Sequence, residues 1–180
     1  MNGFLNGRTV GFVVAQHGVE ERELTGPREA AEAAGARTVL LAPAAGEVEA
    51  LRDGVVSSRY DVDRIVSAAS GRDLDALVLP DGESNSRALR GQVAVEALIS
   101  EFAASARPIG AFGHAVWSLL DAGVLRGRAV TSHPSLEAAL VGAGARWHDR
   151  RVVVDDNIIT SRASPDIDAF NTQLIAFLDR

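Results

Sequence analysis

The segment at residues 108–117, Pro-Ile-Gly-Ala-Phe-Gly-His-Ala-Val-Trp, has the pattern of a buried strand, a sharp turn at Gly113 and His114, and a helix. Many α/β hydrolytic enzymes hold their nucleophile at the apex of such a turn. The apex residue here is Gly113, and the chain of 180 residues contains no cysteine. The turn therefore predicts the framework of a nucleophilic site without its nucleophile, because a catalytic cysteine reacts as its thiolate.

Acid–base side chains remain near this turn. His114 follows the apex directly; it is either a general base or ligand contact, or a helix-start residue with no chemistry of its own. Glu23 is expected to point into the pocket, where a carboxyl group needs a partner or stays protonated. His114 and Arg22 are its candidate partners. The neighbouring Glu20 and Glu21 are expected to be solvated surface charges.

Other polar residues give weaker indications. His17 lies in a predicted loop and is either a ligand contact or an exposed loop histidine. With Glu23 and His114 it would make a set of the kind that binds catalytic zinc. The spacing matches no standard motif, however, and we expect neither a metal nor another cofactor. Several serines are more simply loop hydroxyls or caps than replacement nucleophiles: Ser84, Ser86, Ser118 and Ser132.

The elements that must position these residues alternate between strands and helices. Continuous apolar runs predict strands buried on both faces, at residues 10–15, 38–42, 74–79 and 108–112. One helix is predicted to begin at Pro27 with Thr25 as its cap. Another is predicted to present one apolar face made of Leu89, Val93, Ala97, Leu98 and Phe102. Hairpins are predicted within residues 46–58 and 152–160.

This alternation predicts an α/β fold, a three-layer α/β/α sandwich around a mainly parallel, flavodoxin-like sheet, with a strand–elbow–helix at Gly113. We expect one domain over residues 1–180, with residues 1–7 flexible. In such sheets ligands bind beyond the carboxyl ends of the strands. Three predicted loops meet that description, at residues 16–23, 80–86 and 113–114.

The composition excludes several classes of function. The net charge is -6 and no segment concentrates arginine, which argues against nucleic-acid binding. Every basic residue apart from histidine is arginine, so lysine chemistry is excluded, as are disulfides. Apolar residues make up 47% of the chain, but no run is long enough to cross a membrane or to act as a signal peptide. We therefore expect a cytoplasmic protein that binds no membrane.

Four ordered segments carry a resemblance to a known family. Residues 18–27 read G-V-E-E-R-E-L-T-G-P, residues 74–82 read L-D-A-L-V-L-P-D-G, residues 131–135 read T-S-H-P-S, and residues 152–162 read V-V-V-D-D-N-I-I-T-S-R. In this order, over almost the whole chain, they resemble the PfpI family of intracellular proteases. That family belongs to the class I glutamine-amidotransferase-like superfamily, which also contains the parkinsonism-associated protein deglycase.

The resemblance implies a role for several motif positions, and it shows where this chain departs from the family pattern. The family's nucleophile motif is A-[IV]-C-H-G-P-W, and residues 111–117 read A-F-G-H-A-V-W, so Gly113 replaces the cysteine. The carboxylate that contacts the thiolate in the family matches Glu23. Asp81 replaces the first glycine of L-P-G-G, whose loop helps to form the oxyanion site. Ser86 stands where the family's proteases place a glutamate that reaches a neighbouring subunit. The resemblance also implies a homodimer or higher homo-oligomer and a role in the stress response.

Two hypotheses follow. In the first, the protein keeps the fold and the pocket but binds or senses a small molecule without hydrolysing it. The ligand contacts would be His17, Gly82, Glu83 and Gly113. Backbone N–H groups at residues 82 and 83 and at the start of the helix at residue 114 would suit a small acid or an amide-like metabolite, although the charges of Asp81 and Glu83 oppose a strong anion.

In the alternative, the protein is an intracellular hydrolase (protease, amidase or deglycase-like) in which Glu23 and His114 are catalytic and activate water. General acid–base catalysis alone contributes about 10²–10⁴-fold. That factor is small for a hydrolase, so this hypothesis ranks second.

Overall fold

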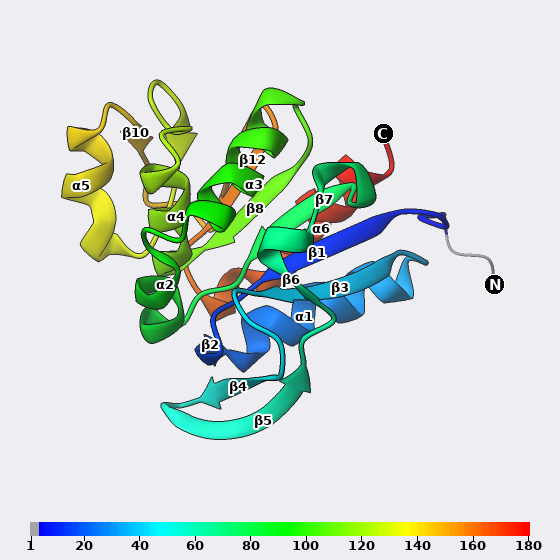
Figure 1. Ribbon diagram of the computed structural model, residues 1–180. Helices are drawn as coiled ribbons and strands as arrows, with labels where there is room; N and C mark the ends of the chain where they lie inside the picture. Colours follow the sequence, from blue (N-terminus) through cyan, green and yellow to red (C-terminus); the bar gives the residue numbers. More distant parts are fainter. Residues whose placement is uncertain (1–3) are drawn as a thin grey trace.

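A seven-stranded sheet runs through the centre of the computed structural model, which describes residues 4–180 (Figure 1). The strand order is β11–β12–β8–β7–β1–β3–β6. Every neighbouring pair is parallel except β11 and β12. The strands are β1 (Thr9–Val13), β3 (Arg37–Ala42), β6 (Arg64–Ile65), β7 (Ala76–Leu79), β8 (Ile109–Phe112), β11 (Val152–Asp155) and β12 (Ile158–Ser161).

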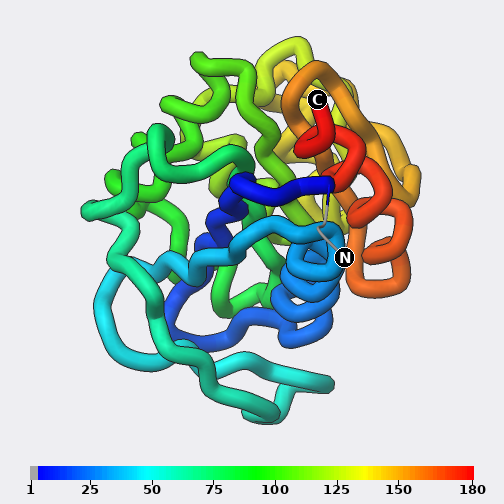
Figure 2. The backbone as a smooth tube through the Cα atoms, turned by 90° about the vertical axis from the view of Figure 1, so that its right-hand side faces the viewer, coloured from blue at the N-terminus to red at the C-terminus, as the bar shows by residue number. Residues whose placement is uncertain are grey.

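Helices cover both faces of this sheet, as Figures 1 and 2 show. Side chains alternate across each strand, so each strand supplies two separate cores. One core joins residues such as Phe12 and Val78 to the layer of α1 (Glu21–Ala33) and α6 (Ile167–Leu178). The other joins Leu77 and Ile109 to the layer of α3 (Val93–Ala104) and α4 (Val116–Asp121). The predicted three-layer α/β sandwich with a mainly parallel sheet is confirmed.

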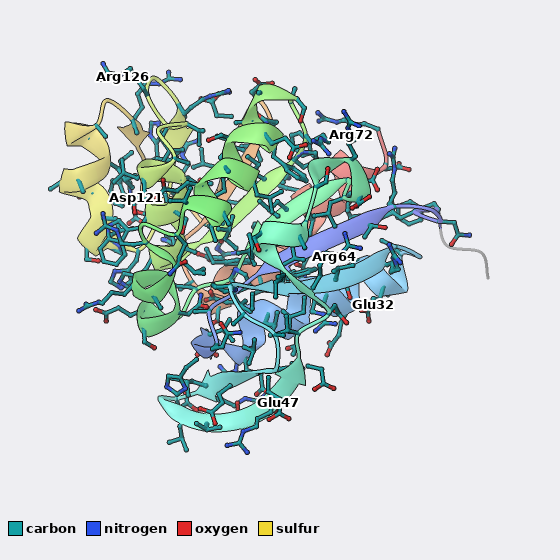
Figure 3. The ribbon with its side chains drawn as sticks, in the orientation of Figure 1. Glu32, Glu47, Arg64, Arg72, Asp121 and Arg126 are labelled. Atoms are coloured by element: carbon teal, nitrogen blue, oxygen red, sulfur yellow. The ribbon has the colours of Figure 1, made fainter. Side chains whose placement is uncertain are left out.

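Smaller elements lie around this framework. A three-stranded sheet has the order β2 (His17–Glu20), β4 (Glu47–Arg52), β5 (Val55–Asp61), and its β4–β5 hairpin projects below the main sheet in Figure 1. A two-stranded sheet pairs β9 (Ala129–Val130) with β10 (Arg146–Trp147). Two short helices are α2 (Glu83–Leu89) and α5 (Glu137–Gly142). Single 3-10 turns occupy residues 66–68, 71–73, 113–115, 134–136 and 164–166. The exposed Glu32 of α1 and Glu47 of β4 are labelled in Figure 3.

The first helix begins earlier than the sequence indicates. The predicted loop at residues 16–23 is in fact β2, which pairs with β4, followed directly by α1 from Glu21. Pro27 therefore lies inside the helix rather than at its first position, and Thr25 is not its cap. The side chain of Glu20 caps the helix instead, by accepting from the N–H of Arg22. Strand pairing with a hairpin far along the chain outweighs the local proline signal.

The predicted helix with the face from Leu89 to Phe102 is two helices. Gly91 has φ 71° and separates α2 from α3. The turn redirects the chain, so Val93 is 78% exposed and Ala97 is also exposed, while Leu89 and Phe102 are buried. Glycine adopts this backbone conformation without a Cβ clash.

The expected flexibility of residues 1–7 stays a prediction, and residues 1–3 lie outside the described residues. Leu5 is buried, and its N–H donates to the carbonyl of Ala34 at 3.0 Å, so this residue packs against the end of α1. Among residues 4–180, the helices are too short or too polar to cross a membrane.

Candidate functional site

The strand-to-helix elbow lies where the sequence places it. Gly113 follows β8, is buried, and has φ 47°. The next residues form one 3-10 turn that leads into α4. Because a side chain in this left-handed region is strained, by about 1–3 kcal/mol, glycine relaxes a turn that a cysteine would hold under strain. The sharp turn predicted at Gly113 is thus confirmed.

The carboxylate of Asp81 fills the space beside Gly113. A Cβ atom at residue 113 would overlap the Oδ2 atom of Asp81 and would lie 2.7 Å from its Cγ atom. The carbonyl oxygen of Arg162 would lie 3.0 Å away on another side. The glycine at 113 and the aspartate at 81 are therefore sterically matched, and the site has no room for a side chain at the elbow apex.

Hydrogen bonds on every side hold Asp81 in place. Its Oδ1 atom accepts from the buried hydroxyl of Ser86 at 3.1 Å, and its Oδ2 atom lies 3.2 Å from Nδ1 of His114. Its backbone N–H donates to Glu23 at 3.0 Å, and its carbonyl accepts from the N–H of Glu20 at 2.9 Å. The side chains of Asp81 and His114 are only 11% and 13% exposed, so their contact is largely shielded from water.

Gly82 allows the turn after β7 to lie close to β2. It has φ 113°, and a Cβ atom there would overlap the carbonyl oxygen of Gly18. The turn after β7 can therefore approach β2 closely only with glycine at this position. The three predicted segments at the carboxyl ends of the strands do converge, although the first of them is a strand and a helix start.

Glu23 points into this region as expected, but its partners differ. It is 2% exposed, and it contacts the backbone N–H of Asp81 and the hydroxyl of Ser164, at 3.0 and 2.9 Å. Neither His114 nor Arg22 contacts it. Burial first, and then the negative charge of Asp81, raise the pKa of Glu23 to about 8. With this pKa, the carboxyl is mostly protonated at neutral pH.

The neighbouring acidic residue Glu21 is not a solvated surface charge. It is 5% exposed, and its carboxylate contacts Arg52 at 2.7 Å and the Tyr60 hydroxyl at 3.1 Å. Both partners lie on the β4–β5 hairpin, so the hairpin folds back over the start of α1. Glu20 is half-buried and lines the cleft described below.

His114 has a second contact, on the side away from Asp81. Its Nε2 atom lies 3.3 Å from the hydroxyl oxygen of Ser135, and its ring stacks on that of His133 with centroids 4.1 Å apart. The hydrogen bond to Asp81 raises the pKa of His114. Burial, and then the charge of His114, lower the pKa of His133. Sequence reasoning noted the T-S-H-P-S segment but did not single out Ser135 or His133.

A cleft of about 570 Å³ opens on the other side of Asp81. It lies between the β4–β5 hairpin and α2. Of the predicted ligand contacts, Gly82 and Glu83 line it, whereas His17 and Gly113 do not. The lining residues are Gly18, Glu20, Leu51, Gly54, Gly82, Glu83, Ser84 and Arg87.

The remaining candidates lie apart from this group. His17 is exposed on β2, and its Nδ1 atom contacts Glu49 at 2.9 Å, so it does not join Glu23 and His114. Across residues 4–180, histidines and carboxylates are nowhere gathered in threes as a metal would need. Ser132 accepts from the Trp147 indole at 3.0 Å, Ser84 lines the cleft, and Ser118 is buried in α4.

Comparison with known proteins agrees with this fold. The model of the DJ-1/PfpI family matches residues 8–177. YraA of Bacillus subtilis (strain 168), named as a candidate cysteine protease, is 32% identical over 159 residues, which cover 88% of this chain and 92% of YraA. Protein/nucleic acid deglycase 2 of Escherichia coli (strain K12) is 31% identical over 160 residues, 88% of this chain and 91% of the deglycase. The crystal structure of Drosophila melanogaster DJ-1beta superimposes with a TM-score of 0.85 at 25% identity, covering 96% of this chain and 91% of that one.

Proposed function

The chain belongs to the DJ-1/PfpI family, and from that premise we propose that it binds a small polar molecule and does not carry out the cysteine-dependent hydrolysis that the resemblance implies. One observation carries the proposal. The Asp81 carboxylate occupies the space that a nucleophilic side chain at residue 113 would need. Protease, amidase or deglycase chemistry through that position is therefore blocked sterically as well as chemically. A cytoplasmic location is part of the same proposal.

The charges around the cleft favour a neutral or cationic ligand. Glu20 and Glu83 line it, and the only arginine in the lining, Arg87, is already paired with Glu83 at 2.6 Å. The backbone N–H of Asp81, which would serve an anion, donates to Glu23 instead. An amide or amine group suits the carboxylates of Glu20 and Glu83 better than a ligand carboxylate does. Of the two ligand classes that the sequence left open, a small acid and an amide-like metabolite, this favours the second.

The ligand class can be tested with three matched probes of equal chain length: butyramide, butylamine and butyrate. We expect butyramide or butylamine to raise the melting temperature more than butyrate, because the lining presents carboxylate acceptors. Leu51→Arg places a bulky charged side chain in the cleft and should abolish the shift. Val93→Arg makes a comparable change at an exposed position outside the cleft, and should leave the shift unchanged. Equal shifts in both variants, or a preference for butyrate, would contradict the proposal.

The blocked elbow can be tested by restoring the thiol. We expect no turnover of aminopeptidase, amidase or methylglyoxal substrates by the wild type. Gly113→Cys alone should remain inactive and lose stability, because its side chain overlaps Asp81. The double variant Asp81→Gly with Gly113→Cys should fold and gain weak activity, with Asp81→Gly alone as the control. Wild-type turnover that disappears in His114→Ala would overturn the binding function.

A second candidate, a hydrolase that activates water through His114, is favoured by the Asp81–His114 contact. That contact orients the imidazole, whose other nitrogen lies 3.3 Å from the Ser135 hydroxyl. In such a hydrolase Glu23 would not activate water together with His114, because the two side chains are not in contact. Its raised pKa suits a general acid instead. The substrate assays above separate this candidate from the binding protein.

A further inference from the structure

The hydroxyl of Ser135 lies between two imidazole nitrogens. Its Oγ atom is 3.3 Å from Nε2 of His114 and 2.8 Å from Nδ1 of His133. Ser135 itself is exposed, at the 3-10 turn that precedes α5. A hydroxyl in this position can be approached from solvent while its proton has two acceptors close by.

A carboxylate completes the arrangement behind His114. Asp81 contacts Nδ1 of His114 at 3.2 Å and is itself fixed by Ser86. Carboxylate, imidazole and hydroxyl thus lie in sequence, from the turn after β7, the elbow after β8 and the turn before α5. This order is the arrangement that activates a serine in unrelated hydrolytic folds, where it is recognised by geometry and not by sequence position.

The hydrogen bonds define which nitrogens are free to accept the proton. The Nδ1 atom of His133 accepts the backbone N–H of Ser135 at 3.3 Å, so it carries no proton of its own. With Asp81 accepting from Nδ1 of neutral His114, the Nε2 atom of that ring is unprotonated and faces the hydroxyl. Both rings therefore present acceptors to Ser135.

We propose that Ser135 is a nucleophile that accepts an acyl group from a small activated ester, with His114 as its base and Asp81 as the group that orients this base. The Oγ atom forms a bond to the carbonyl carbon while its proton passes to Nε2 of His114. The bond from that carbon to the leaving oxygen breaks, the electron pair stays on the leaving oxygen, and the imidazolium returns the proton to it. The products are O-acyl-Ser135 and the free alcohol or phenol.

The surroundings of Ser135 suit a short acyl chain. A separate cleft of about 350 Å³ is lined by Pro134, Ser135, Glu137, Ala138 and Val141. Ala138 and Val141 give it an apolar side, and Glu137 disfavours an anionic acyl group. This cleft shares no lining residue with the one beside Gly82, so acyl transfer here goes beyond the proposed binding function and does not depend on it.

The probe for this proposal is p-nitrophenyl acetate. The chain has neither lysine nor cysteine, so two of the usual competing nucleophiles are missing, and the position of the acetyl group distinguishes Ser135 from the histidines. We expect a burst of one equivalent of p-nitrophenol per chain and one acetyl group on the peptide that contains Ser135. The burst should be lost in Ser135→Ala and slowed about 100-fold in His114→Ala. Ser105→Ala removes another exposed serine hydroxyl, away from any of these groups, and should change nothing.

The dependence of the burst rate on pH distinguishes a Ser135 hydroxyl that His114 activates from one that is merely exposed to solvent. The burst rate should rise with pH as His114 becomes neutral, at a pH above the usual histidine range, because Asp81 raises its pKa. Glu83 also raises this pKa, Arg87 lowers it, and His133 faces the same ring. In Asp81→Asn the midpoint should move to lower pH. Acetylation that persists in Ser135→Ala, or equals wild type in His114→Ala in protein whose circular dichroism is unchanged, would overturn the proposal.

Discussion

Asp81 determines which chemistry the candidate site can support. The L-P-G-G pattern of the resemblance has a glycine at this position. The side chain of Asp81 instead fills the space beside Gly113 and contacts His114. Its charge also helps to keep Glu23 protonated. One carboxylate thus affects three groups of the candidate site, namely Gly113, His114 and Glu23.

Stability against pH should reveal the buried proton on Glu23. The pKa of this carboxyl is about 8 in the folded protein, against 4.5 for an unperturbed glutamate in the unfolded chain. The folded state therefore keeps a proton that the unfolded state loses, so stability falls as pH rises from 4.5 to 8. Glu23→Gln mimics the protonated form and should be more stable at pH 9 by up to about 5 kcal/mol. Urea unfolding from pH 5 to 9 measures the difference.

A matched control for this experiment is Glu29→Gln, an exposed change on the same helix. It should follow the wild-type curve. Parallel curves for Glu23→Gln and wild type would show that the carboxyl is ionised in the folded protein.

At the scale of elements, the sequence correctly predicts those strands and turns whose formation depends on local sequence patterns. The central strands, the elbow and the hairpins are found where the sequence pattern places them, because apolar runs and turn residues act locally. The start of α1, the break at Gly91 and the burial of Glu21 were not predicted, since each depends on packing between distant segments. Ser135 was missed for the same reason. Its partner His114 lies 21 residues away, and no spacing rule connects them.

The contact of Glu21 with Arg52 should hold the β4–β5 hairpin against α1. Arg52→Ala removes this contact, whereas the Tyr60 hydroxyl still donates to the carboxylate. Because the arginine is 52% exposed, we expect a loss of about 1 kcal/mol, which corresponds to about fivefold faster hydrogen exchange in residues 47–61. Arg64→Ala removes a surface pair outside the hairpin, with Asp73, and should leave that exchange unchanged (Figure 3). Equal exchange in both variants would show that the contact does not tether the hairpin.

At the scale of the whole molecule, the two clefts lie on different sides of the Asp81–His114 pair. One is bounded by the hairpin and α2, the other by the turn before α5. Reactivity at Ser135 and binding beside Gly82 can therefore be measured separately in one protein. Asp81 contacts His114 and directly precedes Gly82, so its replacement is expected to change both readouts, whereas Leu51→Arg should change only binding.

Homo-oligomerisation remains a prediction. Light scattering after size exclusion should give a multiple of the 18.9 kDa chain mass, and we expect a dimer rather than a hexamer with shared sites. Ser86 is buried and donates to Asp81 within its own chain, so it does not reach a second subunit. A monomer at micromolar concentration would contradict the expectation. A hexamer whose assembly changes in Ser86→Ala would contradict the role of that serine.

The steric match between positions 81 and 113 also couples substitutions at these two positions. A thiol introduced alone at residue 113 collides with the carboxylate, and a glycine introduced alone at residue 81 removes the contact of the imidazole. Because only the two changes together make room for sulfur, we expect their effects on stability to be non-additive.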